Sequence, residues 1–151
     1  MCTACSDHDR SLFQAMYHGS APRPMTRSDL NDIRHTAVRH NAAAGVTGVL
    51  LYGWQQFVQV LEGPGGELLS LLGCIARDDR IQTMQIDAIE PIQSAAFPDW
   101  TMLVVNLEAA GSDARFRYAA IMESIRTTIT PGARVASVQM HLAEMQAYLV
   151  A

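Results

Sequence analysis

Two strand-like runs joined by only three residues limit what this chain can fold into. Residues 46–52 (VTGVLLY) and 56–62 (QFVQVLE) are rich in the β-branched and aliphatic side chains that strands favour. Only Gly53, Trp54 and Gln55 separate them. A connection this short joins antiparallel neighbours, because a parallel pair needs a crossover of a dozen or more residues. The sequence therefore predicts an antiparallel hairpin, around which the other elements must be arranged.

The segments on both sides of the hairpin predict the rest of the sheet. A helix over 27–43 precedes it, with Thr26 and Asp29 in a capping box, and a helix over 67–77 follows it. Further strands are expected at 12–18, 82–90 and 101–107. The order βαββαβ predicts an α+β, ferredoxin-like sheet with an added fifth strand and two helices on one face.

The same patterns divide the chain into three parts, which are an N-terminal tail (1–10), a domain (11–108) and a C-terminal helical extension (109–151). In the extension, apolar side chains three and four positions apart form a narrow seam, which consists of Val135, Val138, Leu142, Met145 and Leu149. Such a seam packs either on the open face of the sheet or on another chain. A homo-oligomer, most simply a dimer, is therefore one expectation.

Composition excludes several classes of protein. Hydrophobic residues make up 49% and charged residues 17% of the 151 residues, which is typical of a globular chain. A net charge of −4 with scattered basic residues argues against a nucleic-acid partner. No apolar run approaches the roughly 20 residues that span a bilayer, and the first ten residues do not form a secretory signal. We expect a cytoplasmic protein without a membrane partner.

Metal chemistry is also not expected. Cys2 and Cys5 form a C-x-x-C pair, but it lies in a polar tail and has no second pair of ligands. The five histidines include no H-x-x-x-H pair that a helix would place on one face.

Three polar residues stand in apolar surroundings. Alternation along 57–61 places Gln59 on one face with Phe57 and Leu61, and Tyr17 lies in a similar strand. Asn41 interrupts the apolar stripe of the first helix. Each has an ordinary explanation when taken alone, such as a solvated strand face or a helix end. Together they predict an apolar slot for a planar, uncharged ligand that forms hydrogen bonds. No nucleophile–base pair accompanies them, so we expect binding and not enzymatic turnover.

At these residues the sequence resembles the BLUF domain, a flavin-binding sensor of blue light. The resemblance covers about residues 12–107 and rests on several motifs in combination, which are Tyr17, RHN at 39–41, GVTGVLLY at 45–52, FVQVLEG at 57–63, RDDR at 77–80, EPI at 90–92 and FPDWTM at 97–102. It implies a flavin, usually FAD, that stands between the two helices.

The resemblance also implies a set of cofactor contacts. Ile33 and Ile75 would sandwich the isoalloxazine ring, and Asn41 would hydrogen-bond to its polar edge with His40 close by. Asp78 and Arg80, at the end of the second helix, would lie near the polar side chain of the cofactor.

The photochemistry of the family assigns tasks to four more positions. Tyr17 would donate an electron and a proton, and Gln59, between Tyr17 and the flavin, would rotate, tautomerise or do both. An amide suits this task because its two ends are a donor and an acceptor of similar shape. Trp100 and Met102 on the fifth strand would carry the signal toward the C-terminal extension and a protein partner.

The sequence also departs from the family pattern. Gly19 stands where members commonly have a serine, Cys74 where a basic residue is common, and Ile81 where a histidine is common. The last two weaken the case for phosphate contacts and leave FAD, FMN and riboflavin open. An alternative of another class is a flavin-free, ferredoxin-like interaction module. An enzyme with acylphosphatase-like or flavin-reducing activity is a more distant reading. An acylphosphatase would need an arginine-bearing phosphate loop after the first strand, for which the lone Arg23 is a poor candidate.

Overall fold

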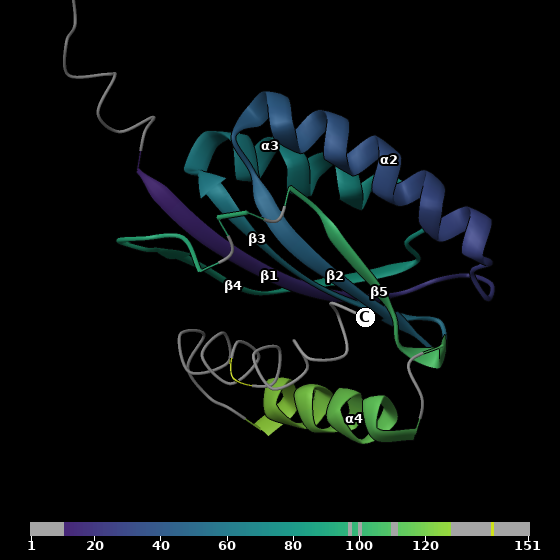
Figure 1. Cartoon of the computed structure of the whole chain (residues 1–151). Coiled ribbons are helices and arrows are strands. Elements are labelled where there is room, and N and C mark those ends of the chain that lie inside the picture. The colour runs from purple at the N-terminus through teal and green to yellow at the C-terminus, as the bar shows by residue number, and fades with distance from the viewer. Residues whose placement is uncertain (1–10, 97, 100, 110–111, 128–139, 141–151) are drawn as a thin grey trace, which may run out of the picture.

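The computed structural model of the chain describes residues 11–96, 98–99, 101–109, 112–127 and 140. Five strands form one sheet in the order β4-β1-β3-β2-β5 (Figure 1). The strands are β1 (Leu12–Ser20), β2 (Thr47–Gly53), β3 (Gln56–Pro64), β4 (Thr83–Pro91) and β5 (Leu103–Asn106). All neighbours pair antiparallel except β2 and β5, which are parallel. The predicted ferredoxin-like α+β fold with an added strand is confirmed.

Helices cover both faces of the sheet. The helices α2 (Arg27–Ala44) and α3 (Gly65–Ala76) lie together on one face, as predicted (Figure 1). The short 3-10 helix η1 (Leu107–Ala109) leads to α4 (Ser112–Thr127), which lies on the opposite face. All five residues of the predicted seam at 135–149 lie outside the described residues. Of the described helices, none has the length and apolar character needed to cross a bilayer.

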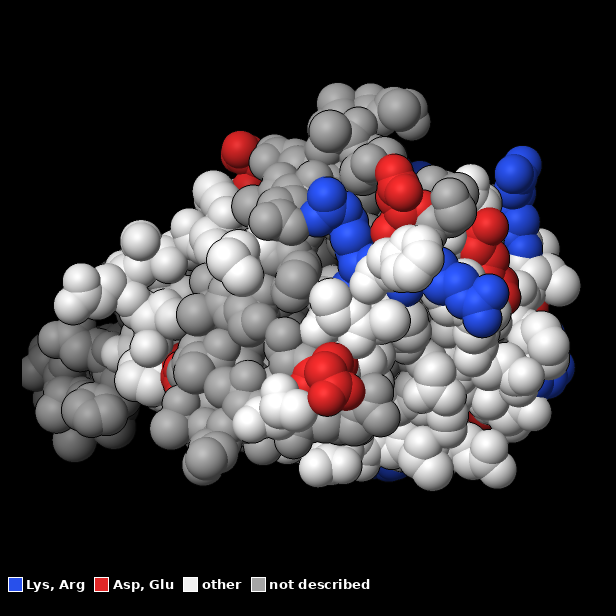
Figure 2. All heavy atoms as spheres, turned by 90° about the horizontal axis from the view of Figure 1, so that it is seen from below, with Lys and Arg blue, Asp and Glu red and all other residues white. Residues whose placement is uncertain are grey.

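Alternation along the strands gives each face its own core. On β3, Phe57 and Leu61 pack under α2 and α3, while Val58 and Val60 pack toward α4. The α4 layer is completed by Ile121, which is fully buried. Seen from below, acidic and basic side chains on this face are intermixed and do not gather by sign (Figure 2).

Several boundaries differ from the predicted ones by one or two residues; for example, β1 ends at Ser20 and β3 at Pro64. The helix α3 begins at Gly65 and not at Glu67, and Gly65 lies against the ring of Phe13, where a Cβ would come within 2.9 Å of that ring. The fifth strand begins at Leu103 and not at residue 101. The carbonyl of Thr101, just before it, instead accepts a hydrogen bond from Asn41.

The hairpin turn between β2 and β3 has an uncommon backbone. Its two central residues are left-handed, with φ of 51° at Trp54 and 61° at Gln55. A two-residue turn fits the twist of the strands only when φ is positive at both positions, which is why Asn-Gly is the usual sequence. Holding a bulky residue in this region costs roughly 1–3 kcal/mol. Contacts elsewhere must therefore stabilise this turn.

The edge strand β4 is irregular beside the site strand β1. The register shifts between Met16 and Tyr17, which face Ala88 and Ile86, so that Asp87 is the extra residue of a bulge. The buried carboxylate of Asp87 lies with Oδ2 2.7 Å from Nδ1 of His18. The bulge thus shifts the register by one residue, and β4 stays paired with β1 on both sides of it.

Candidate functional site

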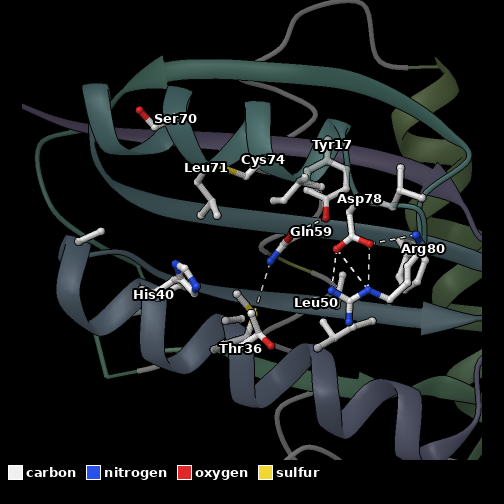
Figure 3. Close-up of a pocket in the computed structure, with 18 of the residues that line it drawn as sticks. Tyr17, Thr36, His40, Leu50, Gln59, Ser70, Leu71, Cys74, Asp78 and Arg80 are labelled. Atoms are coloured by element: carbon white, nitrogen blue, oxygen red, sulfur yellow. Dashed lines mark hydrogen bonds and ion pairs between the residues drawn. The ribbon is translucent and has the colours of Figure 1, made fainter.

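A cavity of about 310 Å³ lies between α2 and α3, above the middle of the sheet (Figure 3). Ile33 on α2 and Ile75 on α3 contribute half-buried apolar side chains to its walls. Tyr17 and Gln59 point into it from β1 and β3. The cavity is therefore apolar at its sides, with polar groups on its floor.

The floor of the cavity contains a buried tyrosine–glutamine pair. The register of β1 and β3 places Tyr17 directly opposite Gln59. The Tyr17 hydroxyl donates a hydrogen bond to Oε1 of Gln59. Both side chains are almost fully buried, with exposed fractions of 3% and 5%. Cross-strand pairing thus explains how an amide is accommodated in an apolar strand.

Burial also determines the protonation state of Tyr17. Desolvation, and after it the negative charge of Asp78, raises the pKa of the Tyr17 phenol well above its ordinary value. The phenol therefore stays protonated at all physiological pH values. It is a permanent hydrogen-bond donor to Gln59 in this structure.

The other end of the Gln59 amide points toward the segment that precedes β5. Its Nε2 lies 3.5 Å from the sulfur of Met102, which is a weak acceptor (Figure 3). In this orientation Gln59 accepts from Tyr17 and donates toward Met102. The amide of Gln59 on β3 therefore links β1 to the segment that precedes β5.

The second predicted amide holds the same segment. Asn41 is 1% exposed, and its Nδ2 donates to the carbonyl of Thr101 at 2.8 Å. It lies in the last turn of α2, whose end is set by Gly45 at φ 70°, with the Gly45 N–H bonded to the Asn41 carbonyl. A left-handed C-cap of this kind favours glycine. The cap positions Asn41 at the cavity.

The segment held by these amides has to cross the sheet. Because β4 and β5 lie at opposite edges, residues 92–102 pass three strands between them. The N–H of Ala96 donates to the buried carboxylate of Glu62 at 2.7 Å, and Gln14 donates to the same carboxylate at 2.8 Å. The crossing segment is thus anchored at its middle by Glu62 and at its end by two residues of the cavity.

An ion pair lies at one end of the cavity. The guanidinium and the backbone N–H of Arg80 donate to Asp78 at distances from 2.6 to 3.2 Å (Figure 3). These hydrogen bonds lower the pKa of Asp78 and keep it ionised. The charge of Arg80 is therefore largely balanced within the protein.

Nearly all residues predicted for the site line this one cavity. They are Tyr17, Ile33, His40, Asn41, Gln59, Ile75, Asp78, Arg80 and Met102. Met102 was predicted on the fifth strand but lies just before it. Trp100, predicted beside Met102, falls outside the described residues.

Sequence reasoning missed several further lining residues. Thr36 lies one turn before His40 on α2, and Ser70 one turn before Cys74 on α3. The 3.6-residue helical period could have indicated both, because positions four apart share a face. Of the described residues, no group of three or more His, Cys, Asp or Glu side chains is arranged to hold a metal ion.

Fold and cavity together define a class of protein, which is a small α+β module that binds a ligand between two helices on a sheet. The model of the BLUF family, described as sensors of blue light using FAD, matches residues 12–103. This chain belongs to the BLUF family, whose members are flavin-binding sensors of blue light.

The curated relatives are much longer proteins. Photoactivated adenylate cyclase subunit beta of Euglena longa is 41% identical over 95 residues, which are 62% of this chain and 11% of that protein. The subunit beta-like protein FB of Euglena gracilis is 36% identical over 101 residues, or 66% of this chain and 12% of that protein. This chain therefore spans about a tenth of their length and matches only their BLUF part.

Solved structures of similar fold include chains of about the length of this one. The dark-state structure of the BLUF protein BlrB has a TM-score of 0.71 at 26% identity, covering 90% of this chain and 98% of that one. The BLUF structure of BlrP1 has a TM-score of 0.66 at 26% identity, covering 84% and 88%. The likeness to BlrB thus extends over nearly its whole length.

The structure gives a physical reason for one departure from the family pattern. At Gly19, where BLUF members commonly have a serine, an added Cβ would overlap with the backbone carbonyl oxygen of Thr83. We expect Gly19→Ser to push β4 away from β1 and to destabilise the protein by about 1–3 kcal/mol. A thermal melt should show a clearly lower Tm.

A second glycine provides the control for this substitution. A Cβ at Gly73 in α3 would meet only Arg77, at an ordinary distance of 3.5 Å. Serine also has the better helix propensity, so Gly73→Ser should leave the Tm unchanged or raise it. An unchanged Tm in Gly19→Ser would show that the contact with Thr83 does not require glycine.

Proposed function

We propose that this chain is a blue-light photoreceptor that holds a flavin non-covalently in the cavity between α2 and α3. The observation that carries the proposal is the buried chain of contacts from Tyr17 through Gln59 to Met102 on the cavity floor. Polar groups on the floor of an apolar cavity fix the orientation of a ligand. This arrangement also places an acceptor and a donor of similar shape at the two ends of one amide. It suits a site in which hydrogen bonds are exchanged.

The cavity lining fits a flavin. Ile33 and Ile75 offer apolar surfaces on facing helices, between which a planar ring would be sandwiched. Asn41 and His40 would meet the polar edge of the ring. The remaining polar side chain of the cofactor would extend toward Asp78 and Arg80.

When bound, the flavin supplies absorption of blue light and an oxidising excited state. In this proposal Tyr17 would donate an electron and a proton to the photoexcited cofactor and would recover both once Gln59 has rearranged, so that no net oxidation remains. Its O–H already points at an acceptor within the protein. Gln59 can respond by rotating or tautomerising, which exchanges the donor and acceptor ends of its amide. Its contacts with Tyr17 and Met102 then change together, which biases the segment before β5.

We propose FAD as the flavin, following the description of the family. Arg80 contributes a guanidinium group to the cavity lining. Its ion pair with Asp78 leaves little net positive charge to bind the phosphates of a cofactor. FMN and riboflavin are therefore the alternatives. Chromatography of the cofactor released from purified protein would identify it.

The output is proposed to be a protein–protein contact. Solved relatives of this family include longer proteins such as the Klebsiella pneumoniae BlrP1, of which this chain covers 27% at 28% identity and a TM-score of 0.63. We propose that residues 11–108 sense light and that the extension 109–151 contacts a cytoplasmic protein partner. Met102 and Trp100 are the candidate residues for passing the signal on. A dimer remains part of this proposal, and sedimentation analysis in light and darkness would test it.

The absorption spectrum provides the direct test. Purified full-length protein is expected to be yellow, and blue light should shift its flavin absorption to longer wavelength, with recovery in darkness. Colourless protein that riboflavin, FMN and FAD all fail to reconstitute would refute the proposal. That result would favour the flavin-free interaction module.

Cys74 allows the location of the flavin to be tested as well. It is exposed and lines the cavity, so in a Cys2→Ser, Cys5→Ser background it should react with a maleimide. Bound flavin should slow this reaction by about tenfold or more, as expected at saturating ligand. The control is Leu69→Cys with Cys74→Ser, on the exposed side of α3, where flavin should have no effect. Equal reactivity of Cys74 with and without flavin would place the cofactor elsewhere.

A further inference from the structure

The left-handed turn between β2 and β3 is held by elements from the far end of the described chain. The indole ring of Trp54 lies 5.7 Å from the ring of Tyr118 on α4, measured between centroids. The guanidinium carbon of Arg115, also on α4, lies 5.4 Å above the indole. The backbone N–H of Trp54 donates to Oε1 of Glu108 in η1 at 3.2 Å. Three contacts thus join the turn to η1 and α4.

These contacts explain why a tryptophan can occupy this position. A left-handed backbone disfavours a bulky residue, and both central residues of the turn lack the freedom of glycine. Packing on α4 therefore opposes the preference of the turn itself. The backbone of this turn is held in an unfavourable conformation by its contacts with α4. A movement of either the turn or α4 therefore alters those contacts.

The turn is also close to the proposed switch. It leads directly into β3, where Gln59 is the fourth residue. Tyr118, which contacts Trp54, belongs to the same core cluster as Val58 and Val60, the two neighbours of Gln59 on the opposite face of β3. The hydroxyl of Tyr118 is buried without a hydrogen-bond partner among the described residues. The helix α4 thus contacts the turn that precedes β3 and shares a core cluster with the side chains on the underside of β3.

We propose that Trp54 is a positioning residue that couples β3, and with it Gln59, to the helix α4. This inference rests on the proposed photoreceptor function and adds an output route that does not pass through Met102 or β5. When Gln59 rearranges, β3 shifts, and the turn transmits the shift to Tyr118 and Arg115. Coupling free energies are reciprocal, so the packing of α4 on Trp54 also affects the relative stability of the two states of Gln59.

The experiment measures amide hydrogen exchange of α4 in the full-length, flavin-loaded protein, in darkness and under blue light. In the wild type, exchange within 112–127 should change on illumination. Trp54→Asn keeps a residue that tolerates the left-handed backbone but removes the ring. We expect it to retain the flavin red-shift and to lose the light response of α4.

Two further variants keep the inference falsifiable. Trp54→Phe retains an aromatic ring and should preserve the light response of α4. Glu108→Ala removes the acceptor for the Trp54 N–H while leaving the rings in place, and it should weaken the response even if Trp54→Asn folds poorly. An α4 that responds to light equally in Trp54→Asn or Glu108→Ala and in the wild type would overturn the inference. A wild type that shows the red-shift without any response of α4 would overturn it too, whereas a wild type without a red-shift refutes the proposed function itself.

Discussion

The Gln59→Leu variant is expected to bind flavin and to show no red-shift under blue light. Leucine has a volume close to that of glutamine and is compatible with the buried position between Phe57 and Leu61. It can neither accept the hydrogen bond of Tyr17 nor donate toward Met102. With both contacts removed, no donor and acceptor remain to be exchanged. Difference spectra recorded before and after illumination would measure the effect.

A matched substitution on the same strand controls for this result. Gln56 begins β3 and does not line the cavity, so Gln56→Leu should leave the red-shift intact. Gln59→Leu also leaves the buried Tyr17 hydroxyl without its acceptor, which costs about 1–3 kcal/mol. Combining it with Tyr17→Phe should recover part of that stability. A normal red-shift in Gln59→Leu would remove Gln59 from the mechanism.

The Tyr17→Phe variant is expected to remain yellow and to lose the photocycle. It removes a single oxygen atom and leaves the ring in its apolar surroundings, so the cavity keeps its shape. The buried phenol is the group whose O–H contacts Gln59, and phenylalanine can donate neither that proton nor an electron with comparable ease. Illumination should therefore produce no long-lived red-shifted state. A photocycle like that of the wild type would contradict the assigned role of Tyr17.

A second buried tyrosine separates photochemistry from stability. The hydroxyl of Tyr52 accepts a hydrogen bond from the N–H of Met25 at 2.7 Å, and this side chain does not line the cavity. Tyr52→Phe leaves a buried N–H without its acceptor, so it should lower the Tm while the red-shift stays normal. Tyr17→Phe should thus lose the red-shift, whereas Tyr52→Phe should keep it and show a lower Tm.

Most of the fold could be predicted because it follows from local patterns. Alternation identified β3 and assigned Gln59 to the same face as Phe57 and Leu61, which is where the structure has them. The capping box at Thr26 correctly marked the beginning of α2. Strand alternation and the capping box are set by residues close together in the sequence, and the tertiary contacts of this fold are consistent with both.

Other features depend on contacts between distant segments and could not be predicted. The hydrogen bond from Asn41 to Thr101 joins residues 60 positions apart, and it lies just before β5, which begins at Leu103 and not at residue 101. By contrast, the ferredoxin-like topology already predicts that the two central strands, β1 and β3, are neighbours, which brings Tyr17 opposite Gln59. The motifs of the family identified the residues of this pair, whereas the orientation of the amide needed the structure.

The two outer strands of the described sheet have a consequence for how this protein can meet other chains. Unpaired strand edges are templates for strand addition and for aggregation. Here β4 is interrupted by its bulge at Asp87, and β5 is only four residues long. Neither offers a long, regular row of free backbone groups to a partner. Any assembly of this receptor should therefore form through side-chain contacts and not through strand addition. Illumination can then change the contacting surfaces without exposing an aggregation-prone strand edge.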